Sequence, residues 1–155
     1  MDLIEMTPLK AVMPILRVSS KKILFQDLAN RLASVSSIDE NLLFTSLLAR
    51  ERLGSTAMGH GVAVPHCRLP NAPRLFGCLA RLETPVDFDA LDGEPVDLVY
   101  ALVAPACAGA DHLKALAKVS RALRDEDVRR KLRGSAGSPP RCCGCAPRSP
   151  RSLYP

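Results

Sequence analysis

Two apolar segments, residues 75–82 and 96–103, place the strongest constraint on the fold. The stretch between them is rich in turn-forming residues, including Asp92, Gly93 and Pro95, so turn signals separate the two segments. We therefore predict two buried strands. Such strands need a covering layer on their sheet, and amphipathic helices are the elements that supply it.

Two helices are expected before these strands, over residues 26–33 and from Ser37 to residue 53. The first carries an apolar stripe of leucines at four-residue spacing, Leu24, Leu28 and Leu32. The second starts with a capping box of Ser37 and Glu40 and is ended by Gly54. Its inner side should carry Leu42, Leu43, Leu47 and Leu48.

Two more helices are expected after the strands. Asp111 can cap the first, and the second spans residues 126–133 before Gly134 ends it. The first should present on one face Leu113, Leu116, Val119, Ser120 and Leu123. The alternation of strands and helices predicts one α/β domain over residues 1–133, in which helices sandwich a mixed sheet.

Residues 134–155 differ from the rest of the chain in composition. They are rich in Gly, Ser, Pro, Arg and Cys, and they contain no acidic residue. Such a segment cannot bury a core, so we predict disorder; the composition is more typical of a shifted reading frame than of an evolved extension. Cys142 and Cys145 have a Cys-x-x-Cys spacing, but zinc normally needs a second ligand pair, so no metal site is predicted.

Charge, hydropathy and cysteine usage argue against several classes of protein. The net charge is +5, but Arg141, Arg148 and Arg151 supply three of these charges, and no basic run is interleaved with aromatic residues. The first ten residues lack a signal-peptide core, and the longest weakly polar stretch, residues 98–110, is too short to span a membrane. We expect a cytoplasmic protein with no nucleic-acid partner and no membrane insertion. Its reduced cysteines should be small packing residues, namely Cys67, Cys78 and Cys107.

A glycine-rich loop over residues 54–65, which includes a short strand, leads to His66. Backbone amides in such a loop can approach an anion closely, and an imidazole can attack a phosphoryl group near neutral pH. The second ring nitrogen would donate a hydrogen bond that sets the tautomer. Donors for the phosphoryl oxygens could be Arg50, Ser55 and His112. By spacing alone, a structural role stays open for His66 and His60.

The same region resembles the signature of a known family. Residues 50–56 (Arg-Glu-Arg-Leu-Gly-Ser-Thr) and 59–66 (Gly-His-Gly-Val-Ala-Val-Pro-His) are similar to enzyme IIA of the bacterial phosphotransferase system, fructose/mannitol type and nitrogen-regulatory branch. The resemblance spans roughly residues 5–133. It continues through residues 82–90, 95–99 and 111–113.

This resemblance implies a mannitol-type enzyme IIA fold and a phosphohistidine carrier that needs protein partners and no cofactor. His66 would accept the phosphoryl group from a small histidine phosphocarrier protein, and Arg50 and His112 would line it. Ser55 and Thr56 would bind the phosphate. A kinase or a transporter would be the regulated target.

The chain departs from the family pattern at two places. Cys67 stands where glycine is usual and adds bulk beside the nucleophile. Residues 134–155 replace a segment that is usually an acidic helix, and its loss would expose apolar surface and promote self-association.

Three interpretations stay open. The chain can be a phosphotransfer intermediate, or a regulatory binding protein whose partner choice is switched by phosphorylation. It can also be an inactive, truncated relative, as Cys67 and the unusual tail suggest. A sugar-uptake component is often part of a longer chain, so the absence of a fused transport domain in this sequence favours regulation.

Overall fold

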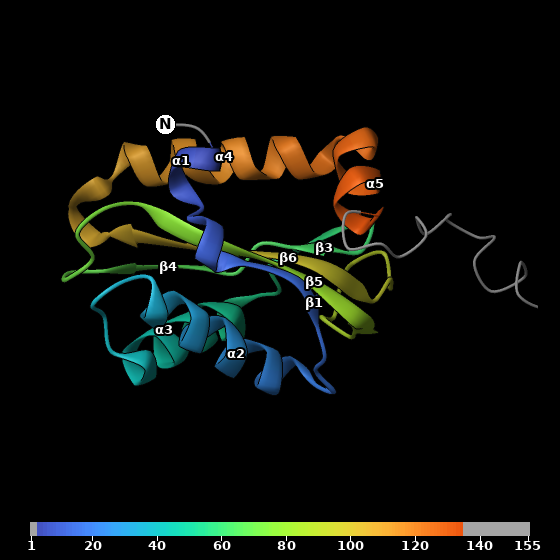
Figure 1. The fold of residues 1–155 in the computed structure, drawn as a ribbon, viewed down its shortest axis with the longest axis horizontal. Coiled ribbons are helices and arrows are strands. Elements are labelled where there is room, and N and C mark those ends of the chain that lie inside the picture. The colour runs from blue at the N-terminus through green and yellow to red at the C-terminus, as the bar shows by residue number, and fades with distance from the viewer. Residues whose placement is uncertain (1–2, 135–155) are drawn as a thin grey trace, which may run out of the picture.

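The computed structural model describes residues 3–134, and helices lie on both faces of one mixed sheet (Figure 1). Of the segment predicted to be disordered, residues 134–155, Gly134 belongs to a helix, and the rest, with the Cys142 and Cys145 pair, lies outside the described residues. The elements in chain order are α1 (Leu3–Met6), η1 (Leu9–Ala11), β1 (Val12–Leu16), α2 (Lys21–Ser34), α3 (Glu40–Leu53), β2 (Ala57–Gly59), β3 (Val62–Ala63), β4 (His66–Leu69), β5 (Phe76–Val86), β6 (Val96–Pro105), η2 (Ala106–Ala108), α4 (Ala110–Arg124) and α5 (Glu126–Gly134).

The sheet is built around the long antiparallel pair of β5 and β6, which are the two strands predicted from the apolar segments. Phe76 of β5 lies opposite Val103 of β6 at one end of this pair, and Val86 lies opposite Val96 at the other. β1 pairs in parallel with β5, while β3 and β4 both pair in parallel with β6. β2 completes the sheet antiparallel to β3. The predicted mixed sheet sandwiched by helices is therefore confirmed.

Two apolar cores lie on opposite faces of this sheet. On one face, α2 and α3 cover the strands, and Leu28, Leu47 and Val99 belong to this core (Figure 1). On the other face, α1 and α4 cover the strands, and Met6 and Val119 belong to the second core. All but the last residue of β6 are buried, because this strand is covered on both faces. Its apolar run without alternation follows from that position.

The first 34 residues hold more structure than their sequence predicts. Helix α2 begins at Lys21 rather than at residue 26, because the Ser20 hydroxyl accepts a hydrogen bond from the Ile23 amide (3.3 Å) and caps the helix. Strand β1 was not predicted, since only Met13 of its residues is buried and Pro14 interrupts its pattern. A proline is tolerated there because β1 lies at the edge of the sheet.

Two helix caps differ from the prediction. Ser37 does not cap α3, because Asp39 is the N-cap and its Oδ2 accepts a hydrogen bond from the Leu42 amide (3.0 Å). Leu42, which was expected on the inner side of this helix, is 37% exposed. Asp111 does not cap α4, because the helix begins at Ala110, two residues earlier than a cap at Asp111 would place it, and Gly109 is its N-cap. The predicted helix after residue 125 is confirmed as α5.

The predicted loop before His66 contains strands. β2 and β3 form a hairpin, and the predicted short strand corresponds to β3. His66 does not follow a strand in a loop but begins β4, opposite Leu102 of β6. Pro65 has no amide hydrogen to donate, yet its carbonyl accepts a hydrogen bond from the Leu102 amide (2.9 Å). Strand pairing with β6 therefore resumes at the histidine.

Helix α4 is rotated relative to the predicted face. Val119 and Leu123 are buried as predicted, but Leu113 is 66% exposed. The position that points inward is instead His112, which is 8% exposed. One residue along an α-helix turns the side chain by about 100°, so a buried His112 forces Leu113 outward. The buried side of the helix is therefore set by His112 and not, as the apolar pattern had predicted, by Leu113.

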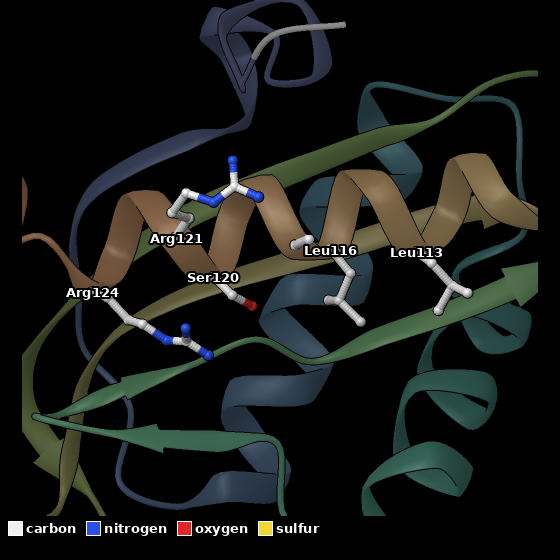
Figure 2. A pocket seen from close by; sticks show the side chains of 6 residues that line it. Leu113, Leu116, Ser120, Arg121 and Arg124 are labelled. Atoms are coloured by element: carbon white, nitrogen blue, oxygen red, sulfur yellow. The ribbon is translucent and has the colours of Figure 1, made fainter.

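This rotation opens a groove along α4. Figure 2 shows Leu113, Leu116, Ser120 and Arg124 directed to the same side of the helix. The groove has a volume of about 330 Å³. It is lined by Leu113, Leu116, Ala117, Ser120, Arg121 and Arg124.

We predict that the protein self-associates through this groove, since the groove exposes apolar surface. Leu113→Ser should weaken association between about 10- and 150-fold, because one leucine side chain contributes roughly 1.5 to 3 kcal/mol when it is buried. Sedimentation velocity over a concentration series measures the effect. Leu91→Ser, which alters a fully exposed leucine in a turn, is the matched control. A monomer at every concentration would contradict the prediction.

Candidate functional site

The His66 imidazole is held by the backbone of the segment that precedes it. Its Nδ1 lies 2.8 Å from the carbonyl oxygen of Val64. A carbonyl can only accept a hydrogen bond, so Nδ1 carries the proton in this geometry. The other ring nitrogen, Nε2, then holds the lone pair. His66 is half-buried, so this nitrogen belongs to a side chain that solvent and a partner can reach.

His112 lies beside His66, although the two residues come from β4 and α4. Their ring centroids are 5.6 Å apart, and the ring planes are inclined by 46°. His112 is buried, and its Nε2 has no hydrogen-bond partner among residues 3–134. A buried nitrogen without a partner is costly unless a ligand satisfies it. The predicted proximity of these two histidines is therefore realised in the fold.

Burial shifts both imidazoles toward the neutral form. Burial lowers the pKa of His66 from its ordinary value of 6.5, and the Arg50 cation lowers it further, while the Val64 hydrogen bond and the Glu51 carboxylate oppose this shift. Burial also lowers the pKa of His112, with further contributions from His66 and Arg68. Neutral imidazole is the nucleophilic form, so both shifts favour attack by nitrogen near neutral pH.

Arg50 lies in the last turn of α3, close enough to His66 to affect its charge. Its Nη1 donates a hydrogen bond to the Gly54 carbonyl (3.0 Å). The remaining guanidinium hydrogens give this side chain donors for an anion. Arg50 is therefore the cation that acts on His66, while Arg68 acts on His112.

The two predicted phosphate ligands, Ser55 and Thr56, make other contacts. The Ser55 hydroxyl donates to the Phe88 carbonyl (2.5 Å) and accepts from the Ala57 amide (3.2 Å). The Thr56 hydroxyl donates to Oε1 of Glu51 (2.5 Å). Each hydroxyl has a single hydrogen to donate, so phosphate binding through either oxygen would first require breaking one of these bonds. Their role as phosphate ligands stays a prediction.

The acceptor of the Thr56 bond is a residue that the sequence analysis missed. Glu51 is 6% exposed, and Lys21 of α2 forms an ion pair with it (Nζ–Oε2 2.8 Å). The Lys21 ammonium also lies 4.6 Å from the centroid of the Phe88 ring. One sequence signal could have identified Glu51, because it follows Leu43 and Leu47 at four-residue spacing and so lies on the inner face of α3.

A second ion pair fixes the hairpin between β2 and β3. Arg133 of α5 pairs with Asp97 (Nη2–Oδ1 2.8 Å) and donates to the His60 carbonyl (2.6 Å). His60 has a positive φ of 57°, and its amide donates to Oδ2 of Asp92 (3.0 Å). Gly61 has a φ of 76°, in the left-handed region that favours glycine, and a Cβ there would lie 2.7 Å from the Arg133 guanidinium. The backbone of His60 thus has a structural role.

The cysteines differ in environment. Cys67 is buried in the core under α2 and α3, and burial raises the pKa of its thiol to about 12. Successive side chains of a strand point to opposite faces, so the bulk of Cys67 is turned away from the His66 imidazole. Cys78 is buried as expected, but the prediction that Cys107 packs in the interior is wrong, since it is exposed.

Residues 3–134 contain neither a membrane-spanning helix nor a metal-binding cluster. No helix in that range is long and apolar enough to cross a membrane. No three His, Cys, Asp or Glu side chains in it come together as a metal site would require.

Comparisons with known proteins show which family and fold this chain is similar to. A family model described as "Phosphoenolpyruvate-dependent sugar phosphotransferase system, EIIA 2" matches residues 7–139. The "Nitrogen regulatory protein" of Bradyrhizobium diazoefficiens is 50% identical over 135 residues, which cover 87% of this chain and 88% of that protein.

Two solved structures are similar in fold. The nitrogen regulatory protein IIA-Ntr from Neisseria meningitidis superposes with a TM-score of 0.80 and 38% identity, covering 83% of this chain and 88% of that one. The IIA mannitol structure from Escherichia coli has a TM-score of 0.70, covering 81% of this chain and 89% of that one. At 19% identity, this second likeness concerns the fold alone. The fold predicted from the family resemblance is thereby confirmed.

The charges around His66 give a prediction with a defined sign. Arg50→Gln should raise the pKa of His66, because the cation that disfavours the imidazolium is removed. NMR titration of the imidazole carbon-bound protons measures the midpoint. Arg52→Gln, on the exposed side of the same helix turn, is the control and should leave the midpoint where it is. A midpoint that falls, or does not move, in Arg50→Gln would contradict this electrostatic account.

Proposed function

The chain belongs to the EIIA 2 family of the phosphoenolpyruvate-dependent sugar phosphotransferase system, and on this premise we propose that it carries a phosphoryl group on Nε2 of His66. The observation that carries the proposal is the hydrogen bond from Nδ1 to the Val64 carbonyl. It leaves the lone pair on Nε2, beside a second imidazole and a cation. The carrier domain in this proposal comprises residues 1–133.

The proposed transfer is a single displacement at phosphorus. The Nε2 lone pair of His66 attacks the phosphorus of a phosphohistidine on a small histidine phosphocarrier protein. As the new N–P bond forms, the N–P bond in the donor breaks, and its electron pair returns to the donor's ring nitrogen. Nδ1 of His66 keeps its proton and its bond to Val64, which stabilises the positive charge that develops on the ring.

The surrounding groups suit the charge on the transferred phosphoryl oxygens. The buried Nε2 of His112 can donate to one oxygen if that nitrogen carries the ring hydrogen, and such a bond would end its lack of a partner. Arg50 supplies a permanent positive charge. Ser55 and Thr56 are proposed to contribute mainly by holding the loop, since their hydroxyls donate to Phe88 and Glu51.

The proposed biological role is regulation linked to nitrogen. The chain is a homologue of proteins named nitrogen regulatory protein, and this supports a phosphohistidine carrier in nitrogen-related regulation. In the finer proposal the protein works in the cytoplasm, receives its phosphoryl group from the small histidine phosphocarrier and acts on a kinase or a transporter.

A second candidate function is that of a binding protein switched by phosphorylation. The half-buried position of His66 favours it, because a phosphoryl group there would alter charge at the surface around α4. An inactive relative is less well supported than the sequence suggests. The bulk of Cys67, one of the two reasons for that interpretation, lies in the core and not against the imidazole.

Phosphorylation of His66 can be measured directly. The wild type, incubated with phosphoenolpyruvate, enzyme I and the small histidine phosphocarrier, should gain one acid-labile phosphoryl group by intact-protein mass spectrometry. His66→Ala should gain none, because it lacks the nucleophile. His60→Ala is the matched control and should be phosphorylated like the wild type. A folded wild type that gains no phosphate would sink the proposal in favour of a purely binding or inactive relative.

A further inference from the structure

We propose that Glu51 is a positioning residue for His66, acting through a chain of hydrogen bonds that runs over Thr56 and Val64. The inference rests on the proposed function of His66, which it extends by naming the group that fixes the reacting imidazole. Among residues 3–134, Glu51 forms no direct hydrogen bond with the imidazole. Its influence must therefore pass through the loop and through its charge.

The first step is the anchoring of Glu51 itself. Its carboxylate accepts the Thr56 amide (3.1 Å to Oε2), the Thr56 hydroxyl (2.5 Å to Oε1) and the Lys21 ammonium (2.8 Å to Oε2). A carboxylate that is 6% exposed and satisfied by three donors is held in one place. Removal of the carboxylate would leave the buried Thr56 donors without an acceptor.

The next steps lead from Thr56 to the imidazole. The Thr56 carbonyl accepts a hydrogen bond from the Val64 amide (3.1 Å), and the Val64 carbonyl accepts one from Nδ1 of His66 (2.8 Å). Each donor in this chain points toward Glu51. The amide and the carbonyl of Val64 belong to adjacent peptide groups, so the coupling is mainly mechanical: it sets where the Val64 carbonyl lies.

A second connection ties the same loop to the other helix. Lys21 pairs with Glu51 and also lies over the Phe88 ring (4.6 Å to its centroid). The Phe88 carbonyl in turn accepts the Ser55 hydroxyl (2.5 Å). The first turn of α2, the last turn of α3 and the loop before β2 thus form one network with Glu51 at its centre.

The position of the Val64 carbonyl matters for phosphoryl transfer because its hydrogen bond selects the tautomer of His66. While that oxygen faces Nδ1, the proton stays on Nδ1 and the lone pair on Nε2. If the oxygen moves, part of the population carries its proton on Nε2 and cannot attack phosphorus. The negative charge of Glu51 also raises the pKa of His66, opposite in direction to the effect of Arg50. Other charged or titratable groups nearby are His112 from α4 and Arg68 from β4, which acts on His112.

The test is Glu51→Gln, which keeps the size of the side chain, removes the charge that pairs with Lys21 and replaces one of the two acceptor oxygens with an NH2 group that can only donate. In the unphosphorylated protein, ¹⁵N NMR should show a larger share of the tautomer protonated on Nε2, and the titration midpoint of His66 should fall. The rate of phosphoryl acceptance should drop between about 10- and 100-fold, as expected when a reacting group is misplaced. Glu83→Gln is the control, since Glu83 is a half-exposed carboxylate paired with Arg17 (2.6 Å).

A folded Glu51→Gln protein whose His66 tautomer and midpoint match the wild type would overturn the proposal. If Glu51→Gln does not fold, Thr56→Val serves in its place, because it removes only the hydroxyl bond to Glu51. A tautomer shift in Thr56→Val supports the proposal, and an unchanged tautomer overturns it. The NMR readouts need no phosphoryl donor, so they test Glu51 even if His66 is never phosphorylated.

Discussion

The hydrogen bond between Nδ1 of His66 and the Val64 carbonyl is the constraint on which the site depends. It assigns the proton to one ring nitrogen and the lone pair to the other. The sheet fixes both ends of this bond, because Pro65 accepts from the Leu102 amide and His66 pairs with Leu102 at the start of β4. The histidine is therefore held by β6, a strand in which every residue but the last is buried.

The second histidine, His112, takes a buried position that an apolar residue would otherwise fill. His112 is directed inward toward His66, and helix α4 is rotated so that Leu113 faces outward into the groove of Figure 2. A leucine in the core would have stabilised the domain by roughly 1.5 to 3 kcal/mol. The structure instead buries an imidazole nitrogen that has no hydrogen-bond partner among residues 3–134, which is the arrangement expected where a ligand completes the site.

The sequence was most informative for segments whose apolar pattern matches their burial in the fold. The apolar runs of β5 and β6 predicted both central strands, and the family resemblance implied that His112 lies beside His66. Edge strand β1 was missed because Pro14 and exposed side chains hide its pattern. The inner face of α4 was misjudged because periodicity cannot tell that a histidine takes the buried position. The contacts of Ser55, Thr56 and Glu51 depend on three-dimensional proximity, which spacing alone does not supply.

We propose that Nε2 of His66 is the reacting atom, because Nδ1 donates its hydrogen to the Val64 carbonyl. Long-range ¹⁵N NMR of the phosphorylated protein tests it directly, because the two ring nitrogens have distinct shifts and couplings. We expect phosphorus on Nε2 of His66, with the proton retained on Nδ1. Phosphorus on Nδ1 would contradict it, since that nitrogen would have to release the Val64 carbonyl before it could react.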